Sequence, residues 1–220
     1  MKRYFITGTD TDCGKTYITC QLLRYFQQHN KKALAIKPVA SGCLEDKGER
    51  FNDDLLLLRQ YNQTAEQEIC PWRLQLPISP HLAAMDEQRE LSAQEITEFC
   101  YKAGASDTEY LFIEGAGGLM VPLNHEETWI DFLMLSQIPV ILVVGMRLGC
   151  LNHALLTESV FKMHNIVCAG WIANCLDQDM LALRENIETL SHRLQAPLLA
   201  TVPYRGHFQG EDCVLLGCSL

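Results

Sequence analysis

The residues with the clearest chemical pattern lie near the N-terminus, where residues 8–16 read Gly-Thr-Asp-Thr-Asp-Cys-Gly-Lys-Thr. The standard phosphate-binding loop has four residues between its first glycine and Gly-Lys-Ser/Thr. Five are present here, so Thr9 takes the place of the first glycine. Backbone N–H groups at the start of a helix bind anions, Lys15 reaches the β and γ oxygens, and the Thr16 hydroxyl can ligate Mg²⁺. The segment predicts a nucleoside triphosphate site without identifying the reaction.

Acidic residues at strand ends are the candidates for the remaining oxygen ligands of such a metal. Glu114 directly follows an apolar run at residues 110–113 and precedes Gly-Ala-Gly-Gly, the position of the second acidic motif in phosphate-loop proteins. Asp53 and Asp54 begin a helical pattern, where acidic residues also occur because they stabilise the helix dipole. From the residues alone, we expect Glu114 to bind metal, whereas the dipole is the better explanation for the two aspartates.

Two further segments carry polar residues where parallel sheets bind ligands. Lys37 ends an apolar run just before a proline, and it is either a ligand-binding lysine or a surface lysine beside a stiff turn. Residues 147–153 join a strongly apolar run to a helix and offer free amides that suit a carboxylate. Within them, Cys150 has no His/Asn pair indicated around it, so packing is favoured over nucleophilic catalysis. His81, in a proline-stiffened turn, is also expected to be structural.

Alternating apolar and amphipathic segments must position these residues. The predicted strands are residues 3–7, 33–37, 110–113, 139–144, 167–173 and 198–202, and the predicted helices are residues 14–28, 52–61, 92–103, 152–164 and 180–194. Repeated strand–helix units favour a parallel sheet with helices on both faces, and the wholly apolar run 139–144 fits a central strand. Residues 70–91 are predicted to be an irregular loop or flap over the site.

The composition fits one α/β domain of ordinary size. The chain has 220 residues, of which 48% are hydrophobic, and a net charge of -9. This charge disfavours nucleic-acid binding and requires local cations at any anion site. Membrane insertion and secretion are not expected, because no apolar run reaches roughly 20 residues and Met1 leads directly into a strand-like segment. The ten cysteines lack zinc-binding spacings, so we expect reduced thiols in a cytoplasmic protein.

Taken together, seven segments resemble dethiobiotin synthetase, an ATP-dependent carboxylase family of biotin synthesis. They are residues 8–16, 37–42, 52–54, 79–81, 114–118, 147–154 and 170–174, in family order within residues 3–205. Many families share the phosphate loop, but its combination with Lys-Pro-Val-Ala-Ser-Gly and Leu-Gly-Cys-Leu-Asn-His is specific. Asp12 stands where the family usually has Glu, and Arg147 where Lys is common; the guanidinium fork can bind a carboxylate in bidentate fashion.

The resemblance implies a single-domain phosphate-loop NTPase fold over residues 1–220, of the α/β class, with a seven-stranded, mostly parallel sheet. It also implies a homodimer with active sites at the interface. The implied partners are ATP, CO2 or bicarbonate, and 7,8-diaminopelargonic acid, with Mg²⁺ as cofactor and no nucleic acid or membrane. One amine would form a carbamate that attacks the γ-phosphorus, and the second amine would close the ring to give dethiobiotin, ADP and phosphate.

The resemblance also implies roles for individual residues. Lys37 and Lys15 become catalytic, and Asp54 becomes a metal ligand beside Thr16 and Glu114. The implied ATP site comprises Asp12, Cys13, Gly14, Lys15, Thr16, Tyr17, Asp54, Glu114, Asn174 (on the adenine), Cys175, Pro203, Tyr204 and Arg205. The implied diamine site comprises Thr11, Lys37, Ser41, Gly118, Arg147, Gly149, Cys150 and Asn152.

Two other functional classes are compatible with a phosphate loop. A nucleotide-switch or positioning ATPase of the same branch often has two lysines in its phosphate loop, of which the first is a signature lysine five residues before the second. The second lysine corresponds to Lys15 here, so the signature position is Asp10. A non-catalytic nucleotide-binding module would consume no ATP in the presence of diamine and CO2. An ATP-consumption assay with and without diamine and bicarbonate therefore separates the three classes.

Overall fold

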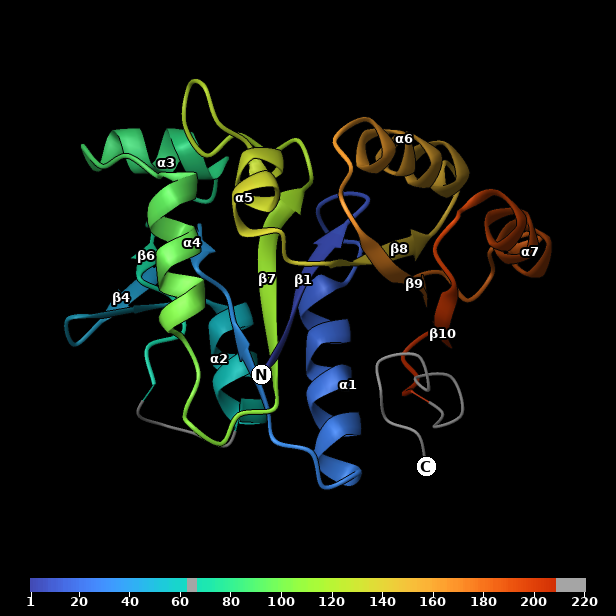
Figure 1. Cartoon of the computed structure of the whole chain (residues 1–220), viewed down its shortest axis with the longest axis horizontal. Helices are drawn as coiled ribbons and strands as arrows, with labels where there is room; N and C mark the ends of the chain where they lie inside the picture. The colour runs from blue at the N-terminus through green and yellow to red at the C-terminus, as the bar shows by residue number, and fades with distance from the viewer. Residues whose placement is uncertain (63–66, 209–220) are drawn as a thin grey trace.

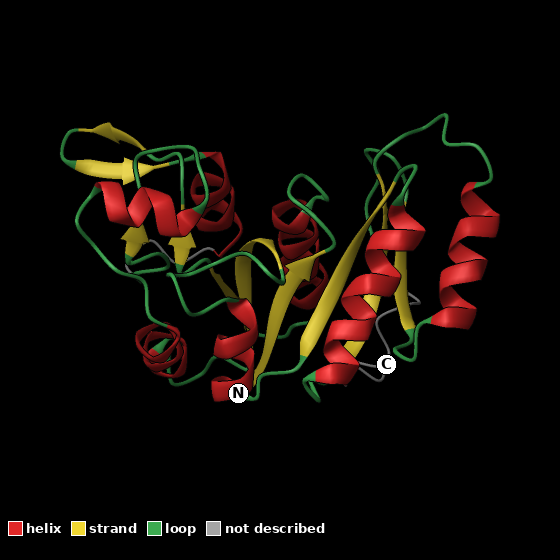
Figure 2. Ribbon diagram, turned by 90° about the horizontal axis from the view of Figure 1, so that it is seen from above, coloured by secondary structure: helices red, strands yellow, loops and turns green. Residues whose placement is uncertain are grey.

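The computed structural model describes residues 1–62 and 67–208, which are built around a six-stranded sheet (Figure 1). All neighbouring strands in this sheet are parallel, and the helices between successive strands cover both of its faces (Figure 2). In spatial order the strands are β10 (Leu198–Val202), β9 (Cys168–Cys175), β8 (Val140–Met146), β1 (Lys2–Gly8), β7 (Tyr110–Gly118) and β2 (Ala33–Ile36).

The helices of the described residues are α1 (Lys15–Gln28), α2 (Asp53–Asn62), α3 (Pro80–Asp86), α4 (Ala93–Lys102), α5 (Trp129–Ser136), α6 (Cys150–Met163) and α7 (Leu183–Arg193). Five of them, α1, α2, α4, α6 and α7, match predicted helical segments to within a few residues, whereas α3 and α5 were not predicted. Ser92 caps α4 by accepting a hydrogen bond from the Glu95 N–H at 3.4 Å, and Asn52 caps α2 by accepting one from the Leu55 N–H at 3.0 Å. Among the described residues, none of the helices is both long and apolar enough to cross a membrane.

The strand count differs from the family expectation. Within the described residues, the main sheet has six strands rather than seven. After β2 the chain reaches Pro38, which has no N–H to continue a ladder. The next extended residues form β3 (Val39–Ala40), which pairs with β6 (Trp72–Arg73) in a separate small sheet. The expectation of seven strands is therefore corrected for this part of the chain.

The segment predicted as an irregular flap contains regular structure. Residues 70–91 include β6 and the short helix α3, so the prediction of a wholly irregular segment is wrong. Pro80 occupies the first turn of α3, where proline is tolerated because its missing N–H has no helical partner. A proline-rich pattern that indicated a turn therefore also marked a helix start. Ahead of it, β4 (Leu44–Asp46) and β5 (Glu49–Phe51) form an antiparallel hairpin.

Packing beneath the glycine-rich end of β7 fixes the backbone of the site. Phe5 of β1 is fully buried, and a Cβ at Gly115 would crowd its ring. Phe5 also packs against Trp129 and Phe132 of α5, with ring centroids 5.2 Å away in each case. The Trp129 indole N–H donates to the Ala116 carbonyl at 3.0 Å. An aromatic cluster therefore anchors the strand end that carries Glu114.

Candidate active site

The phosphate loop lies between β1 and α1, and its backbone is held from a neighbouring strand. Gly14 has a φ of 88°, in the left-handed region that favours glycine. A Cβ there would also clash with the side-chain amide of Asn174, at the end of β9. That amide donates to the Cys13 carbonyl at 2.9 Å, inside the protein. Asn174 therefore supports the loop directly, a contact that the predicted adenine role did not include.

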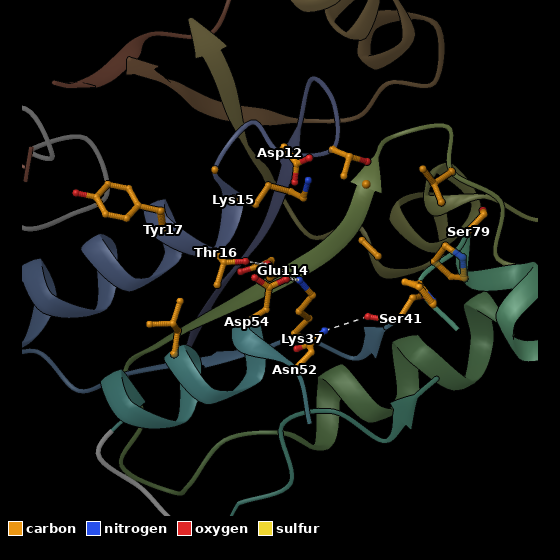
Figure 3. Close-up of a pocket in the computed structure, with 18 of the residues that line it drawn as sticks. Asp12, Lys15, Thr16, Tyr17, Lys37, Ser41, Asn52, Asp54, Ser79 and Glu114 are labelled. Carbon is orange, nitrogen blue, oxygen red and sulfur yellow. Dashed lines mark hydrogen bonds and ion pairs between the residues drawn. The ribbon is translucent and has the colours of Figure 1, made fainter. Parts of the chain in front are cut away.

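A buried cluster of charged and polar side chains lies beside the loop (Figure 3). Lys37, just after β2, is 6% exposed, and Glu114 in β7 is fully buried. The Lys37 ammonium contacts Asp54 in the first turn of α2, and it lies 2.8 Å from Glu114 Oε1. The Thr16 hydroxyl donates to the same Glu114 oxygen at 2.6 Å. Four elements thus bring together the predicted catalytic lysine and the predicted metal ligands.

Opposite charges within the cluster favour the ionised forms of Lys37 and Asp54. Burial lowers the pKa of Lys37, but the charges of Glu114 and Asp54 outweigh burial and place that pKa above its ordinary value. Burial raises the pKa of Asp54, yet the charge and hydrogen bond of Lys37 bring it below its ordinary value. At neutral pH, Lys37 is therefore an ammonium and Asp54 a carboxylate. A fixed positive charge beside a phosphate loop can stabilise charge that develops on a transferring phosphoryl group.

The donor set fits a hard divalent cation. Glu114 Oε2 is buried and has no hydrogen-bond partner within the protein. The Thr16 hydroxyl and the two carboxylates supply the oxygen atoms that Mg²⁺ prefers, and Mg²⁺ is usually held by one or two carboxylates together with substrate phosphates. Across residues 1–62 and 67–208, no group of three or more His, Cys, Asp or Glu side chains could hold a metal. A hydroxyl and two carboxylates of this kind suit a Mg²⁺ ion that is held jointly with nucleotide phosphates.

A cavity of about 710 Å³ is lined by the phosphate loop, by the cluster around Lys37 and by Ser41 in the turn that follows β3. Such a volume accommodates a small-molecule ligand. The lining includes ten of the predicted site residues, namely Thr11, Asp12, Gly14, Lys15, Thr16, Tyr17, Lys37, Ser41, Asp54 and Glu114. The predicted residues outside this lining are Cys13, Gly118, Arg147, Gly149, Cys150, Asn152, Asn174, Cys175, Pro203, Tyr204 and Arg205.

Several residues of the cavity wall were given no individual role in the sequence analysis. Asn52 lines the cavity and donates to the Ser41 carbonyl at 3.0 Å, so the α2 cap also supports the turn that follows β3 (Figure 3). Residues 77–80 also line the cavity. The sequence analysis placed residues 70–91 over the site, but it gave residues 77–80 no individual roles. The Asn-Asp-Asp run of residues 52–54 was the available signal for Asn52.

The junction between β8 and α6 has a different character. Gly149 adopts a φ of 97° before the first turn of α6, and Leu148 is fully exposed. Cys150 is buried, in agreement with its predicted packing role. The Arg147 guanidinium binds Asp10 of the phosphate loop at 2.7 Å. Asp10 was not among the predicted site residues, since its position served only to argue against a signature lysine.

The segment after β10 contacts the first turn of α1. The Tyr17 hydroxyl donates to the Gly206 carbonyl, which fixes this turn beside the cavity that Tyr17 lines. The Arg205 guanidinium lies over the Tyr204 ring, 5.2 Å from its centroid. The family assignment of the adenine pocket extends to Glu211, which lies outside the described residues.

The chain is similar to known proteins over almost its whole length. A family model described as an AAA domain matches residues 2–212. The ATP-dependent dethiobiotin synthetase BioD of Legionella pneumophila (strain Corby) is 55% identical over 206 residues, which cover 94% of this chain and 95% of that protein. This chain belongs to the dethiobiotin synthetase family. The family member from Cellvibrio japonicus (strain Ueda107) is 43% identical and covers 92% of this chain and 89% of its own length.

Likeness in fold extends beyond the dethiobiotin synthetase family. The septum site-determining protein MinD of Pyrococcus horikoshii superposes with a TM-score of 0.53 at 17% identity, covering 91% of this chain and 81% of its own. A ParA family ATPase from Chlorobium tepidum gives a TM-score of 0.55 at 16% identity, with coverages of 96% and 87%. These structures confirm the phosphate-loop NTPase fold and nothing finer. Sequence identity assigns the chain to the dethiobiotin synthetase family rather than to the nucleotide-switch ATPases.

Proposed function

We propose that this protein catalyses the ATP-dependent formation of dethiobiotin from 7,8-diaminopelargonic acid and CO2, with release of ADP and phosphate. The observation that carries the proposal is the arrangement of Lys37 between Asp54 and Glu114, in one cavity with the phosphate loop and the Ser41 turn. Membership of the dethiobiotin synthetase family supplies the substrate class. The cavity brings cations and loop amides to a place where a triphosphate and a carbamate would both need them.

The proposed chemistry has three steps. One amine adds to CO2, losing a proton to solvent and forming a carbamate. A carbamate oxygen attacks the γ-phosphorus, so a new P–O bond forms, the bond to the β-phosphate oxygen breaks, and ADP leaves. The second amine attacks the carbonyl carbon of the resulting carbamic–phosphoric anhydride, expels phosphate, loses a proton to solvent and closes the cyclic urea. Negative charge develops or shifts on oxygen atoms during these steps, so positioning and charge stabilisation account for the catalysis.

The side chains of the cavity divide these tasks. Lys15, 7% exposed in the first turn of α1, binds the β and γ oxygens. Lys37 acts on the transferring phosphoryl group, because its ammonium is fixed by two carboxylates and cannot follow the substrate freely. Thr11 and Ser41 line the same cavity and would bind the diamine. Of the two buried polar atoms that have no partner here, Ser41 Oγ and Glu114 Oε2, the first is thus available to this substrate.

Mg²⁺ is the proposed cofactor, and it would neutralise charge on the β and γ oxygens. Thr16, Asp54 and Glu114 would hold it. The unpartnered Glu114 Oε2 supports this assignment because a buried carboxylate oxygen is seldom left without a partner.

The remaining residues of the implied diamine site support a shared site. Gly149, Cys150 and Asn152 lie outside the cavity lining of their own chain, and so does Arg147, whose guanidinium is paired with Asp10. The junction that carries them is largely exposed. We therefore propose a homodimer in which this junction completes the partner's site, with the N-terminus of α6 binding the substrate carboxylate. Gly118 and Cys175 would contribute backbone contacts, and Pro203, Tyr204 and Arg205 would form the adenine pocket together with Asn174.

A cytoplasmic location is also proposed. The eight described cysteines are free thiols, as expected in a reducing compartment. Seven of them are buried, and burial raises the pKa of Cys20 to about 12. Buried thiols with raised pKa values are poor nucleophiles, so they support a packing role.

One assay tests the proposed function. ADP release is followed with both bicarbonate and 7,8-diaminopelargonic acid, and again with each of them omitted, while mass spectrometry identifies the product. We expect ADP release to require the diamine and to match dethiobiotin in a one-to-one ratio. ADP release that ignores the diamine, or no product of the dethiobiotin mass, would overturn the proposal.

A further inference from the structure

The phosphate loop contains a carboxylate that the proposed mechanism does not use. Asp10 Oδ1 accepts a hydrogen bond from the Thr11 N–H at 2.8 Å, and Oδ2 accepts one from the Arg147 guanidinium at 2.7 Å. The backbone carbonyl of the same residue accepts a hydrogen bond from the Lys15 ammonium at 3.0 Å. Asp10 therefore connects the backbone of the loop, its phosphate-binding lysine and a side chain from the end of β8.

Arg147 reaches this loop from the neighbouring strand. β1 and β8 are paired in parallel, and the Thr9 N–H extends that pairing into the loop by donating to the Val143 carbonyl at 3.1 Å. The ion pair between Arg147 and Asp10 is a second tie between the same two elements. Its side chains are 41% and 46% exposed, so it contributes little to folding stability. A pair that adds little stability but orders a ligand-binding loop points to a functional role.

We infer that Arg147 and Asp10 are positioning residues for nucleotide binding: Arg147 neutralises and orients the Asp10 carboxylate, which orients the Thr11 amide while its backbone carbonyl holds Lys15. The inference rests on the proposed binding of nucleotide phosphates at this loop. It differs from the family-based expectation, in which the Arg147 fork binds the carboxylate of the diamine. The fork already has a carboxylate partner within its own chain.

The negative charge of Asp10 allows an experiment to distinguish a nucleotide-binding role of Arg147 from a diamine-binding role. A nucleotide brings several negative charges to a loop that contains Asp10, and an unpaired carboxylate there would repel them. While Arg147 is present, its positive charge offsets the negative charge of Asp10, so the pair repels the phosphates little. Loss of Arg147 alone should therefore harm nucleotide binding more than loss of both charges together, and the two substitutions should not be additive.

The test is a double-mutant cycle of Arg147→Gln, Asp10→Asn and the double variant, with ADP affinity measured by calorimetry. We expect Arg147→Gln to weaken ADP binding on the order of tenfold. Asp10→Asn keeps an oxygen for the Thr11 N–H and introduces no unpaired negative charge, so it should stay within about threefold of the unmodified protein. The double variant should return to about the same range, and Arg147→Lys should preserve binding because it keeps the ion pair.

Lys162→Gln is the matched control. It also removes one positive charge from an ion pair, that of Lys162 with Glu158 on α6, and it lies outside the phosphate loop. ADP affinity should be unchanged in this variant. Melting temperatures of all variants should agree within a few degrees, which shows that each is folded.

Three outcomes would overturn the inference. In the first, Arg147→Gln leaves ADP affinity unchanged and raises the KM of the diamine, with no rescue by Asp10→Asn, which would assign Arg147 to the diamine carboxylate. In the second, the two substitutions weaken ADP binding additively, so that the residues act separately. In the third, the unmodified protein binds no ADP. The cycle needs no turnover, so a protein that binds ADP but forms no dethiobiotin would refute the proposed function and leave this inference to be decided by the affinities.

Discussion

The cluster around Lys37 and the junction between β8 and α6 both lie at the carboxyl ends of strands of the main sheet, but they differ in how far they are exposed to solvent. In the cluster, Lys37 and Glu114 are almost fully enclosed, and their charges satisfy one another. At the junction, Leu148 is fully exposed, and Gly149 and Asn152 are exposed as well. Groups that must keep a fixed charge are thus enclosed within one chain. Groups that recognise a ligand through backbone amides can lie open until a ligand or a second chain arrives.

The largest effect is expected when Lys37 of the enclosed cluster is replaced. Lys37→Gln keeps a hydrogen-bond donor but removes the charge, so kcat should fall on the order of 1000-fold while the KM of ATP changes much less. Steady-state kinetics combined with ADP calorimetry measures both quantities. If the variant merely loses nucleotide affinity and keeps its kcat, Lys37 is an ordinary phosphate anchor and the enclosed cluster is not the catalytic half of the site.

Glu114→Gln should have the next largest effect. An amide in place of the carboxylate weakens the hold on Mg²⁺, so turnover at about 1 mM Mg²⁺ should fall on the order of 100-fold. The loss should shrink as Mg²⁺ is raised, whereas the Lys37→Gln defect should not respond. Circular dichroism serves as the folding control, because Glu114 is fully buried. Near-normal activity at low millimolar Mg²⁺ would remove Glu114 from the metal site.

A mixing experiment tests whether the open junction serves another chain. Lys37→Gln and Asn152→Ala should each impair activity, but in different halves of a shared site. After subunit exchange about half the dimers are mixed, and each mixed dimer has one intact site, so about a quarter of full activity should return. Exchange is verified with tagged chains. Verified exchange without recovery would show that each site is built within one chain.

The two regions also differ in what the sequence could reveal. The phosphate loop and Glu114 follow from local patterns, because the loop needs fixed residue types at fixed spacing and Glu114 follows an apolar strand. Lys37 and Asp54 were ambiguous until family resemblance was considered, since only the fold shows that β2 and α2 bring them together. The ion pair of Asp10 and Arg147 spans 137 positions, and neither residue type nor spacing indicates it. Likewise, two-residue strands such as β3 and β6 are too short for periodicity to detect.

The smallest predicted effect concerns the segment that carries residues 77–80, which line the cavity. Glu87, just after α3, accepts hydrogen bonds from Arg50 at 2.7 Å and from the Gln75 N–H at 2.8 Å. Burial raises the pKa of Glu87, but these hydrogen bonds and the charge of Arg50 outweigh it, so the pKa lies below its ordinary value. The Arg50 side chain of this ion pair is 28% exposed, so solvent screens the interaction. We therefore expect a modest contribution to stability.

Glu87→Gln should lower the free energy of unfolding by about 1 kcal/mol at pH 7. The direction with pH follows from linkage: a carboxyl with a depressed folded-state pKa stabilises above its unfolded value of about 4.3, and the contribution is lost as pH falls through the folded-state pKa. The difference between the variant and the unmodified protein should therefore be constant from pH 8 to about pH 5 and shrink below about pH 4. Urea unfolding across that pH range measures this difference in stability.

Glu45→Gln is the matched control, because Glu45 lies 3.7 Å from the same arginine but is 56% exposed, and this substitution should change stability little. Equal effects of the two substitutions, or a Glu87 effect that grows in acid, would show that Glu87 does not anchor this wall.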